Sequence, residues 1–300
     1  MSVAEINKDS LVKDLKAIGV KKGDLLHLKI SMRSVGKLNG GANELLDAIL
    51  ESVGDDGTIV SDAFVNVYPL PLSDEKKKII ADDHTRSYAG AFANAMINHP
   101  RMERSKHPIQ KFAAIGRLAK ELCERHVPGS GGYDLLDEMA MMDAKNLTIG
   151  PDVVGVGTTH VAIDQLGFKR KEMNTGALYR NMDGEVKLAK MNWNGGCGRG
   201  FPKFYPLYRE KGGMLAEGKI GDAESVLTSM KRTLAIEKEK LKEDPRFFFC
   251  DDPACYSCRI SWDHSSKNYL AFGWAWLRKN AGSLSFSRFK NLYLVLMKRA

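Results

Sequence analysis

Three cysteines with the spacing of metal ligands lie near the C-terminal end of the sequence. They follow the pattern Cys250-x4-Cys255-x2-Cys258, which is typical of zinc ligands, and the fourth ligand is expected from His264 or from Cys197. The total of five cysteines is odd, and in a cytosolic chain this favours metal ligands or plain thiols over a disulfide framework. The alternative is that the thiols pack under the aromatic run 247–249.

A second segment whose residues could bind a ligand or react is the glycine-rich stretch 194–201, which contains Cys197. It has enough glycine to wrap a ligand or to turn tightly, but it is not a phosphate-loop signature. Cys197 could be a reactive thiol, but no paired base is evident in the sequence. A structural thiol is the favoured interpretation.

Composition and charge restrict the class of protein. The chain has 300 residues, 43% of them hydrophobic and 27% charged, which is typical of a globular protein. No apolar run approaches the roughly 20 residues of a transmembrane helix, and residues 1–13 lack the apolar core of a signal peptide, so we expect a cytoplasmic protein. The net charge of +8 reflects either an ordinary basic surface or attraction for an anionic cofactor. The basic residues are dispersed and form no known binding module, which argues against nucleic acid as a partner.

The elements that would position these residues alternate between helix and strand. Apolar spacing predicts helices over 10–19 and 42–53, and apolar runs of strand length predict strands over 24–30 and 57–61. This alternation indicates an α/β layered domain. Further along the chain, the pattern predicts a long loop over 62–86 and a linker over 128–132. It also predicts helices over 87–98, 113–126, 160–166 and 214–242, and a strand over 147–150.

A set of motifs in a fixed order resembles the aminoglycoside 3-N-acetyltransferase family, also known as the antibiotic N-acetyltransferase family. The resemblance covers residues 8–168 closely and becomes weaker beyond them. The motifs that carry it are Gly23-Asp-Leu-Leu, Ser31-Met-Arg-Ser-Val-Gly36, Gly40-Gly-Ala42, Gly54-x-x-Gly-Thr58, Arg104-Ser-Lys-His-Pro108, Ala113-Ala-Ile-Gly116, His126, Ile149-Gly150 followed by His160, and Gly218-Lys-Ile-Gly-Asp-Ala223.

The resemblance implies a fold, an activity and a cosubstrate. The implied fold is α/β, a mixed central sheet flanked by helices, in a single domain of residues 1–300. Residues 1–168 would be closest to the family core, and residues 169–300 would form a divergent part with the cysteine cluster. The implied reaction is transfer of an acetyl group from acetyl-CoA to an amine of a small molecule, either an aminoglycoside or another amino sugar.

His160 is the expected general base under this resemblance. The acceptor amine must lose a proton, and histidine is the side chain whose pKa suits that step near neutral pH. A carboxylate usually orients such an imidazole. The family has a glutamate three residues after the histidine, where this chain has Ile163, so Asp164 on the same helical face is the expected partner.

Other family positions also differ here. The family's threonine three residues before the histidine is Gly157, and its histidine and serine before Ser31 are Lys29 and Ile30. These changes affect the identity of the acceptor more than the fold.

The resemblance also assigns binding residues. The segment Ser31, Arg33, Ser34, Val35 and Gly36 would lie against the pantetheine arm of coenzyme A. Lys29, Ser105 and His107 would border the acceptor. For Lys29 and Arg33 the alternatives are contact with the phosphates of coenzyme A or plain surface charge. We expect Lys29 to face the acceptor and to repel a polycationic aminoglycoside.

Two hypotheses follow from the sequence. The first is an acetyltransferase that uses acetyl-CoA and a small-molecule amine. The second is a non-catalytic binding protein, stabilised by zinc, that keeps the fold without the chemistry. The missing glutamate favours the second hypothesis, whereas His160, Ser31 and His107 favour the first.

Overall fold

The structure is a computed structural model that describes residues 6–151, 155–170, 174–181, 183–191, 197–283 and 285–286. Its helices are α1 (Lys8–Ala17), α2 (Met32–Val35), α3 (Gly41–Val53), α4 (Ala91–Ile97), α5 (Ala119–Arg125), α6 (Asp134–Met141), α7 (Thr158–Gln165), α8 (Tyr205–Glu210), α9 (Met230–Glu243), α10 (Tyr256–Arg259) and α11 (Tyr269–Asn280), with 3-10 turns at Lys76–Lys78, Phe201–Phe204 and Ala281–Ser283. Its strands are β1 (Leu25–Ile30), β2 (Thr58–Asp62), β3 (Tyr68–Pro69), β4 (Ile80–Ala81), β5 (Glu103–Arg104), β6 (Phe112–Gly116), β7 (Lys145–Ile149), β8 (Thr175–Arg180), β9 (Val186–Lys190), β10 (Met214–Ile220) and β11 (Ala223–Ser229).

A mixed sheet forms the centre of the molecule, in the order β10-β11-β7-β1-β2-β6-β5. Its three middle strands β7, β1 and β2 are parallel, and the strands on either side of them pair antiparallel. The sequences of the middle strands are largely apolar because both faces of these strands are covered. The predicted α/β fold with a mixed central sheet is confirmed.

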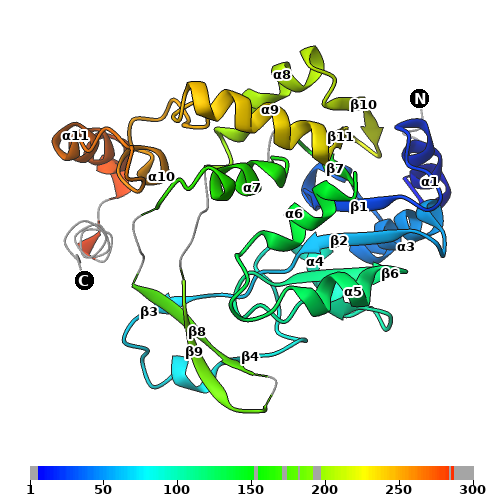
Figure 1. Cartoon of the computed structure of the whole chain (residues 1–300), viewed down its shortest axis with the longest axis horizontal. Helices are drawn as coiled ribbons and strands as arrows, with labels where there is room; N and C mark the ends of the chain where they lie inside the picture. Colours follow the sequence, from blue (N-terminus) through cyan, green and yellow to red (C-terminus); the bar gives the residue numbers. More distant parts are fainter. Residues whose placement is uncertain are drawn as a thin grey trace.

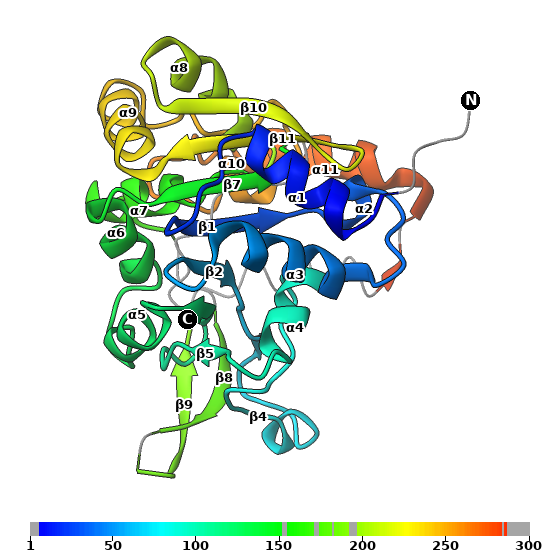
Figure 2. The ribbon, with the colours of Figure 1, turned by 90° about the vertical axis from the view of Figure 1, so that its right-hand side faces the viewer.

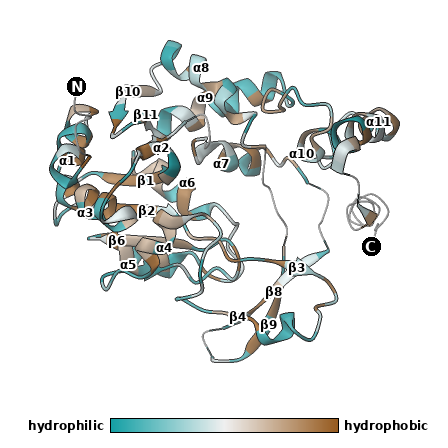
Figure 3. Ribbon diagram, turned by 180° about the vertical axis from the view of Figure 1, so that it is seen from behind, coloured by the Kyte–Doolittle hydropathy of each residue, from teal (hydrophilic) through white to brown (hydrophobic). Residues whose placement is uncertain are grey.

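Helices cover the two faces of this sheet (Figures 1 and 2). Helices α1, α3 and α4 pack on one face, and α5, α6, α7 and α9 pack on the other, so that each face has its own hydrophobic core. Figure 3 shows the same division by hydropathy, with hydrophobic colour on the central strands and much hydrophilic colour on α1. Among the described residues, no helix combines the length and the apolar character that a bilayer span requires.

A smaller second sheet extends from this body (Figure 1). Its strands β3, β4 and β9 all pair with β8. It has a small core of its own, formed by Val65, Ala81, Ile109, Ala177 and Met191. Two of its strands, β3 and β4, fall within the segment 62–86 that the sequence predicts as a loop.

The structure confirms most of the predicted elements in the first 60 residues and corrects two predicted helices later in the chain. Residues 113–126 begin with strand β6 and only then form α5. Residues 214–242 form the hairpin β10–β11 before α9, and Gly221-Asp222 is its tight turn and not the start of a helix. Along β10 the partly buried side chains alternate with exposed ones, which is the period of a strand and not of a helix.

A buried carboxylate lies where α9 packs against α7. Glu237 of α9 is fully buried, and its Oε1 accepts hydrogen bonds from the hydroxyls of Thr159, at 2.5 Å, and Tyr208. Its Oε2 has no hydrogen-bond partner. Burial raises the pKa of Glu237 from 4.5 to about 7, although the hydrogen bonds from Thr159 and Tyr208 act in the opposite direction. Between pH of about 4.5 and about 7, the folded protein therefore holds a proton on this carboxyl that the unfolded chain releases.

This difference in proton affinity predicts a pH-dependent stability. As the pH rises from about 4.5 to about 7, only the unfolded state loses the proton, so the free energy of unfolding falls across this window and then levels off. Glu237→Gln cannot titrate. Its free energy of unfolding relative to the wild type should rise by roughly 2 to 4 kcal/mol between pH 4.5 and pH 7.5, as measured by urea denaturation.

Glu239→Gln on the same helix is the matched control, because the side chain of Glu239 is 56% exposed and pairs with Lys211 at the surface. Its difference from the wild type should stay nearly constant over the same range. Parallel stability curves for Glu237→Gln and the wild type would contradict the assignment of a raised pKa.

Candidate active site

The predicted residue Ser31 and other residues named below lie at the carboxyl edge of the three parallel strands. Ser31 follows β1, Asp62 ends β2 and Gly150 follows β7, and these strands are direct neighbours in the sheet. In open α/β sheets, ligands bind outside the carboxyl ends of the strands. Helix α7, which carries His160, begins shortly after β7 at this same edge.

The segment expected to hold coenzyme A makes a compact turn at the end of β1. The Ser31 N–H donates to the carbonyl of Ile149 (2.9 Å), and the Ser34 hydroxyl donates to the Ser31 hydroxyl (2.8 Å). Val35 is fully buried in the core, so its side chain serves packing and faces no ligand. Arg33 is exposed.

Gly36 closes this turn against the β10–β11 hairpin. A Cβ atom at Gly36 would lie 2.4 Å from Oδ2 of Asp222, and the φ of +98° is one that favours glycine. The Asp222 N–H donates to the carbonyl of Val35 (2.9 Å). The second hairpin strand, β11, pairs with β7, so the turn is held from both sides.

A buried ionic network lies directly behind this turn. Lys29 Nζ donates to Oδ2 of Asp62 (2.8 Å), and Oδ1 of Asp62 contacts Nε2 of His27 (3.1 Å). The other ring nitrogen of His27 contacts Oδ1 of Asn146 (2.7 Å). Burial opposes ionisation of Asp62, but the charge of Lys29 and the hydrogen bond from His27 outweigh it and hold the pKa of Asp62 well below its usual value. The Lys29 ammonium is therefore already neutralised by a carboxylate.

The His27 ring also explains the glycine at position 157. A Cβ atom at Gly157 would lie 2.6 Å from Cε1 of His27, so a threonine does not fit here without movement of the imidazole. Gly157 is the residue directly before α7. The departure from the family pattern at 157 thus lets α7 begin against a buried histidine.

Aromatic rings surround the imidazole of His160. Tyr133 stacks on it with ring centroids 4.3 Å apart and planes within 4°, and Phe201 contacts it edge-on at 5.0 Å. Phe64 and Tyr88 continue this row of rings from Tyr133 toward the surface. The ring of His160 is thus contacted by side chains from two other parts of the chain.

Helix α7 also places the two residues that follow His160. Ile163, at the position of the family's glutamate, is fully buried in the hydrophobic core. Asp164 lies one turn after His160 and is partly exposed. Of the two positions, only 164 offers a carboxylate on this part of the helix.

The motif Arg104-Ser-Lys-His-Pro108 holds neighbouring loops together. The buried Arg104 guanidinium donates to the carbonyls of Ala63, Asp83 and Thr85. Ser105 is fully buried, accepts from the Phe112 N–H (2.9 Å) and contacts His126 Nδ1 (3.1 Å). Ser105 therefore has an internal role and does not face an acceptor.

His107 is tied to its own loop as well. Its Nδ1 accepts from the backbone N–H of Gln110 (2.9 Å) and of Ile109 (3.2 Å), and its ring stacks on that of His126. Burial, together with the neighbouring His126 and Lys111, lowers the pKa of His107 to about 3. The imidazole is therefore neutral near pH 7, with its proton on Nε2.

The cysteine cluster is closed by Cys197. The sulfur atoms of Cys197, Cys250, Cys255 and Cys258 all lie within 4.8 Å of one another, and all four residues are buried. All four are free cysteines. Of the two candidates for the fourth position, Cys197 occupies it although it lies 53 residues before the next cysteine of the cluster.

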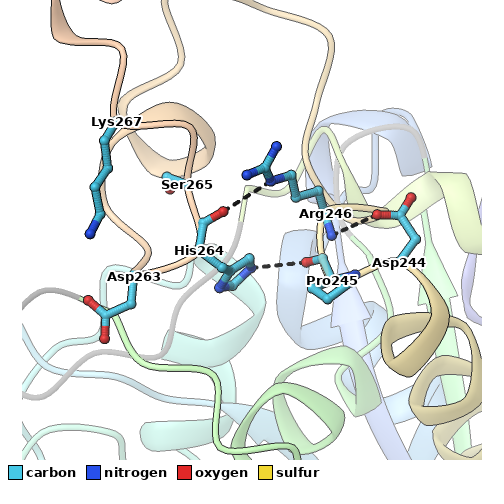
Figure 4. A pocket seen from close by; sticks show the side chains of 7 residues that line it. All are labelled: Asp244, Pro245, Arg246, Asp263, His264, Ser265 and Lys267. Atoms are coloured by element: carbon cyan, nitrogen blue, oxygen red, sulfur yellow. Dashed lines mark hydrogen bonds between the residues drawn. The ribbon is translucent and has the colours of Figure 1, made fainter.

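His264 is engaged elsewhere, which corrects its assignment as a metal ligand. Its Nε2 donates to the carbonyl of Pro245 (3.0 Å), and its carbonyl accepts from Nε of Arg246 (3.0 Å) (Figure 4). These residues line a surface pocket of about 560 Å³, completed by Asp244, Asp263, Ser265 and Lys267. None of the residues expected to bind coenzyme A or the acceptor lines this pocket.

Several site residues were not anticipated from the sequence. His27, Asp62 and Asn146 are polar residues within or at the end of buried strands, and that pattern was the available signal. Tyr133 and Phe201 carried no signal, because their contact with His160 joins segments far apart in the chain.

Comparisons with known proteins agree with this arrangement. A family model described as "Aminoglycoside 3-N-acetyltransferase" matches residues 26–242. The chain is 27% identical over 192 residues to the SPbeta prophage-derived aminoglycoside N(3')-acetyltransferase-like protein YokD of Bacillus subtilis, covering 57% of this chain and 69% of that protein. It is also 27% identical over 168 residues to aminoglycoside N(3)-acetyltransferase III of Serratia marcescens, covering 51% of this chain and 62% of the relative.

A solved structure gives the same fold. "AAC-IIIb binary with CoASH" superposes with a TM-score of 0.69 at 21% identity, covering 79% of this chain and 96% of that one. The enzyme names of the relatives favour the first hypothesis over the non-catalytic one. The family match also continues to residue 242, well beyond the segment 8–168 that carries the closest motifs. Its fold, its motifs and this match together identify the chain as a member of the aminoglycoside 3-N-acetyltransferase family.

Proposed function

We propose that this protein transfers an acetyl group from acetyl-CoA to an amine of a small molecule. The observation that carries the proposal is His160, which lies near the start of α7, after the parallel strand β7, with its ring held between Tyr133 and Phe201. A histidine oriented in this way suits the removal of a proton from an amine. Membership of the family supports the reaction class.

In the proposed reaction the acceptor nitrogen attacks the carbonyl carbon of the thioester. The bond from that carbon to sulfur breaks and the new amide bond forms. His160 takes the proton that the nitrogen loses, and a proton then returns to the sulfur of coenzyme A. Asp164 stabilises the imidazolium that forms in between, in place of the family's glutamate.

For coenzyme A, the turn from Ser31 to Gly36 is the proposed binding segment. A relative of the same fold is named for its complex with CoASH, which supports this choice. Arg33 is exposed beside the turn and is the candidate for the phosphates, because Lys29 is paired with Asp62. An exposed guanidinium suits phosphate oxygens, which it can bind in a bidentate manner.

The acceptor we propose is an amine of low charge and not a polycationic aminoglycoside. A polycation needs uncompensated carboxylates, but two of the carboxylates near the expected acceptor residues are matched by the chain's own cations. Asp62 pairs with Lys29, and Asp83 pairs with Lys106 (2.6 Å) and Lys111 (3.1 Å). The net charge of +8 adds no general attraction. An amino sugar with a single amine fits these conditions.

For the four cysteines we propose a structural zinc ion. Four thiolates fill the coordination shell of zinc and leave no open position for a water molecule or a substrate. Such an ion would take no part in acetyl transfer.

Replacing His160 with Ala tests the base. Turnover on the acceptor should fall by about two to four powers of ten, because no other group takes the proton, while the Kd for coenzyme A stays nearly unchanged. Asp164→Asn should lose less, because a poorly oriented imidazole keeps its own basicity. Thiol release gives the turnover and calorimetry gives the affinity for coenzyme A.

His99→Ala is the control, because His99 lies just beyond α4, which covers the other face of the sheet, and should leave both measurements unchanged. A His160→Ala enzyme with more than half of the wild-type turnover would rule out the assignment of His160 as the base.

The charge argument predicts the acceptor preference. The wild type should acetylate glucosamine, which carries a single amine, far better than the polyamine sisomicin. In Lys29→Gln the Asp62 carboxylate loses its lysine, so relative activity on sisomicin should rise, by roughly tenfold in the ratio of the two kcat/KM values.

Lys145→Gln is a matched control, because it removes a lysine that is bound to Asp24 at the other end of the neighbouring strand β7. It should leave the ratio unchanged. Equal wild-type efficiency on sisomicin and glucosamine would contradict this argument and favour the acceptor of the named relatives.

A further inference from the structure

The spacing of the four cysteine sulfurs matches a single tetrahedral metal ion. The Sγ atoms of Cys197 and Cys255 are 3.7 Å apart, as are those of Cys250 and Cys258. Four sulfurs at about 2.3 Å from one zinc ion are about 3.8 Å from each other, whereas disulfide sulfurs are bonded at about 2.05 Å. Because every pair lies within 4.8 Å, the cage has room for one ion and not for an iron–sulfur cluster with several irons.

Backbone N–H groups point at these sulfurs. The Cys250 N–H donates to Sγ of Cys258 (3.3 Å), and the N–H groups of Arg199 and Asp252 face the sulfurs of Cys197 and Cys250. Hydrogen bonds of this kind stabilise negative charge on sulfur. They form the outer shell that a metal bound by thiolates requires.

Cationic side chains surround the cluster as well. Arg259 donates to the carbonyl of Cys250 (2.5 Å), and Arg170 donates to the hydroxyl of Ser257 between two of the cysteines (3.3 Å). Arg199 lies next to Cys197 and pairs with Asp252 (2.9 Å). A zinc ion with four thiolates has a net charge of about −2, which neighbouring guanidinium groups offset.

We propose that Cys197, Cys250, Cys255 and Cys258 bind one zinc ion, which ties residues 248–258 to the wall of the site around His160. Cys250, Cys255 and Cys258 lie beyond the residues that match the family model, so family membership does not account for them. The first part, zinc binding, is independent of the proposed function. The second part, the effect on His160, rests on it.

The connection to His160 runs through the short segment from Cys197 to Phe201. The Gly200 N–H donates to the carbonyl of Cys197 (2.8 Å), which folds the segment into a tight turn. A Cβ atom at Gly200 would lie 1.9 Å from the carbonyl oxygen of Phe248, so the turn is pressed against the chain that leads to Cys250. Phe201, the next residue, packs its ring edge-on against His160 and also lies near Phe248.

Other contacts also join this segment to residues 248–258, among them the pair of Arg199 with Asp252 (2.9 Å) and the neighbouring rings of Phe201 and Phe248. Lys203 bonds to the Phe249 carbonyl (2.7 Å) and to Asp251 (2.8 Å), but the side chain of Asp251 is 93% exposed. Exposed ion pairs of this kind contribute little stability. The zinc ion would add metal–ligand bonds to these contacts, and together they would keep Phe201 against the catalytic imidazole.

Metal analysis tests the first part on the full-length protein. Protein purified without chelator should contain about one zinc per chain, and four thiols should become titratable when a mercurial reagent releases it. Cobalt(II) in its place should give the thiolate-to-metal absorption and the visible bands of a tetrahedral site.

Cys255→Ser/Cys258→Ser should lose the zinc, whereas Cys123→Ala, which removes the buried cysteine outside the cluster, should retain it. The mercurial titration uses the wild type, so the test remains valid even if the double variant does not fold. Metal-free protein that is fully folded, or iron in place of zinc, would overturn the proposal.

Phe201→Leu tests the second part. It should retain the zinc and the cobalt spectrum, bind coenzyme A as the wild type does, and lower kcat by about tenfold or more, because the imidazole loses its edge contact. The NMR signals of the His160 ring should shift in this variant and also on zinc removal, and this measurement needs no acceptor. Zinc-free protein with unchanged His160 signals would overturn the link while leaving the proposed enzyme activity intact. An inactive wild type with a zinc-dependent His160 signal would overturn the enzyme activity alone.

Discussion

The pairing of Lys29, Asp62 and His27 is the constraint on which the site depends. Lys29 and Asp62 lie toward the carboxyl ends of β1 and β2 with little access to water, and an unpaired charge there would be costly to bury. His27 lies further back on β1 and contacts the same carboxylate. Because Asp62 of β2 bonds to both Lys29 and His27 of β1, the ends of the two parallel strands are fixed relative to one another. The ring of His27 then meets the glycine at which α7 begins. The start of helix α7, which carries His160, is therefore constrained by a buried polar network inside the sheet.

The same network sets the electrostatic character of the site at the carboxyl ends of β1 and β2. The Asp62 carboxylate at the end of β2 would by itself attract amines, but its ion pair with Lys29 cancels most of its negative potential. Lys106 and Lys111 do the same for Asp83. Under the proposed function, this self-neutralisation of acidic groups is the reason to expect little general affinity for polycations.

The sequence predicted the parts of this structure that depend on local pattern. The apolar stripe of α3, the buried strands β1 and β2, and the α/β class could all be read from residue spacing. The hairpin β10–β11 could not, because its tight turn was interpreted as a helix start and the alternating burial of its first strand was missed. Strand β6 falls within a predicted helix because its Ala-Ala-Ile run, considered alone, also fits a helix.

The contacts that make the site lie beyond what spacing can reveal. His27 meets Asp62 and Asn146 across separations of 35 and 119 residues. The fourth cysteine was identified only as one of two candidates, because the sequence does not show that residue 197 folds back on residues 250–258. Tyr133 and Phe201 reach His160 only after three segments have packed.

Two of the departures from the family pattern, Gly157 and Lys29, each have a direct physical partner in the site. Gly157 is coupled to His27, because a side chain at 157 would collide with that ring. Lys29 is coupled to Asp62, because each neutralises the other. Ile163 extends the hydrophobic core under α7, and the nearest carboxylate moves to Asp164. The changes at positions 157, 29 and 163 are thus each accommodated by the packing or the charge pairing around them, and the proposed change of acceptor rests on the charge pairing alone.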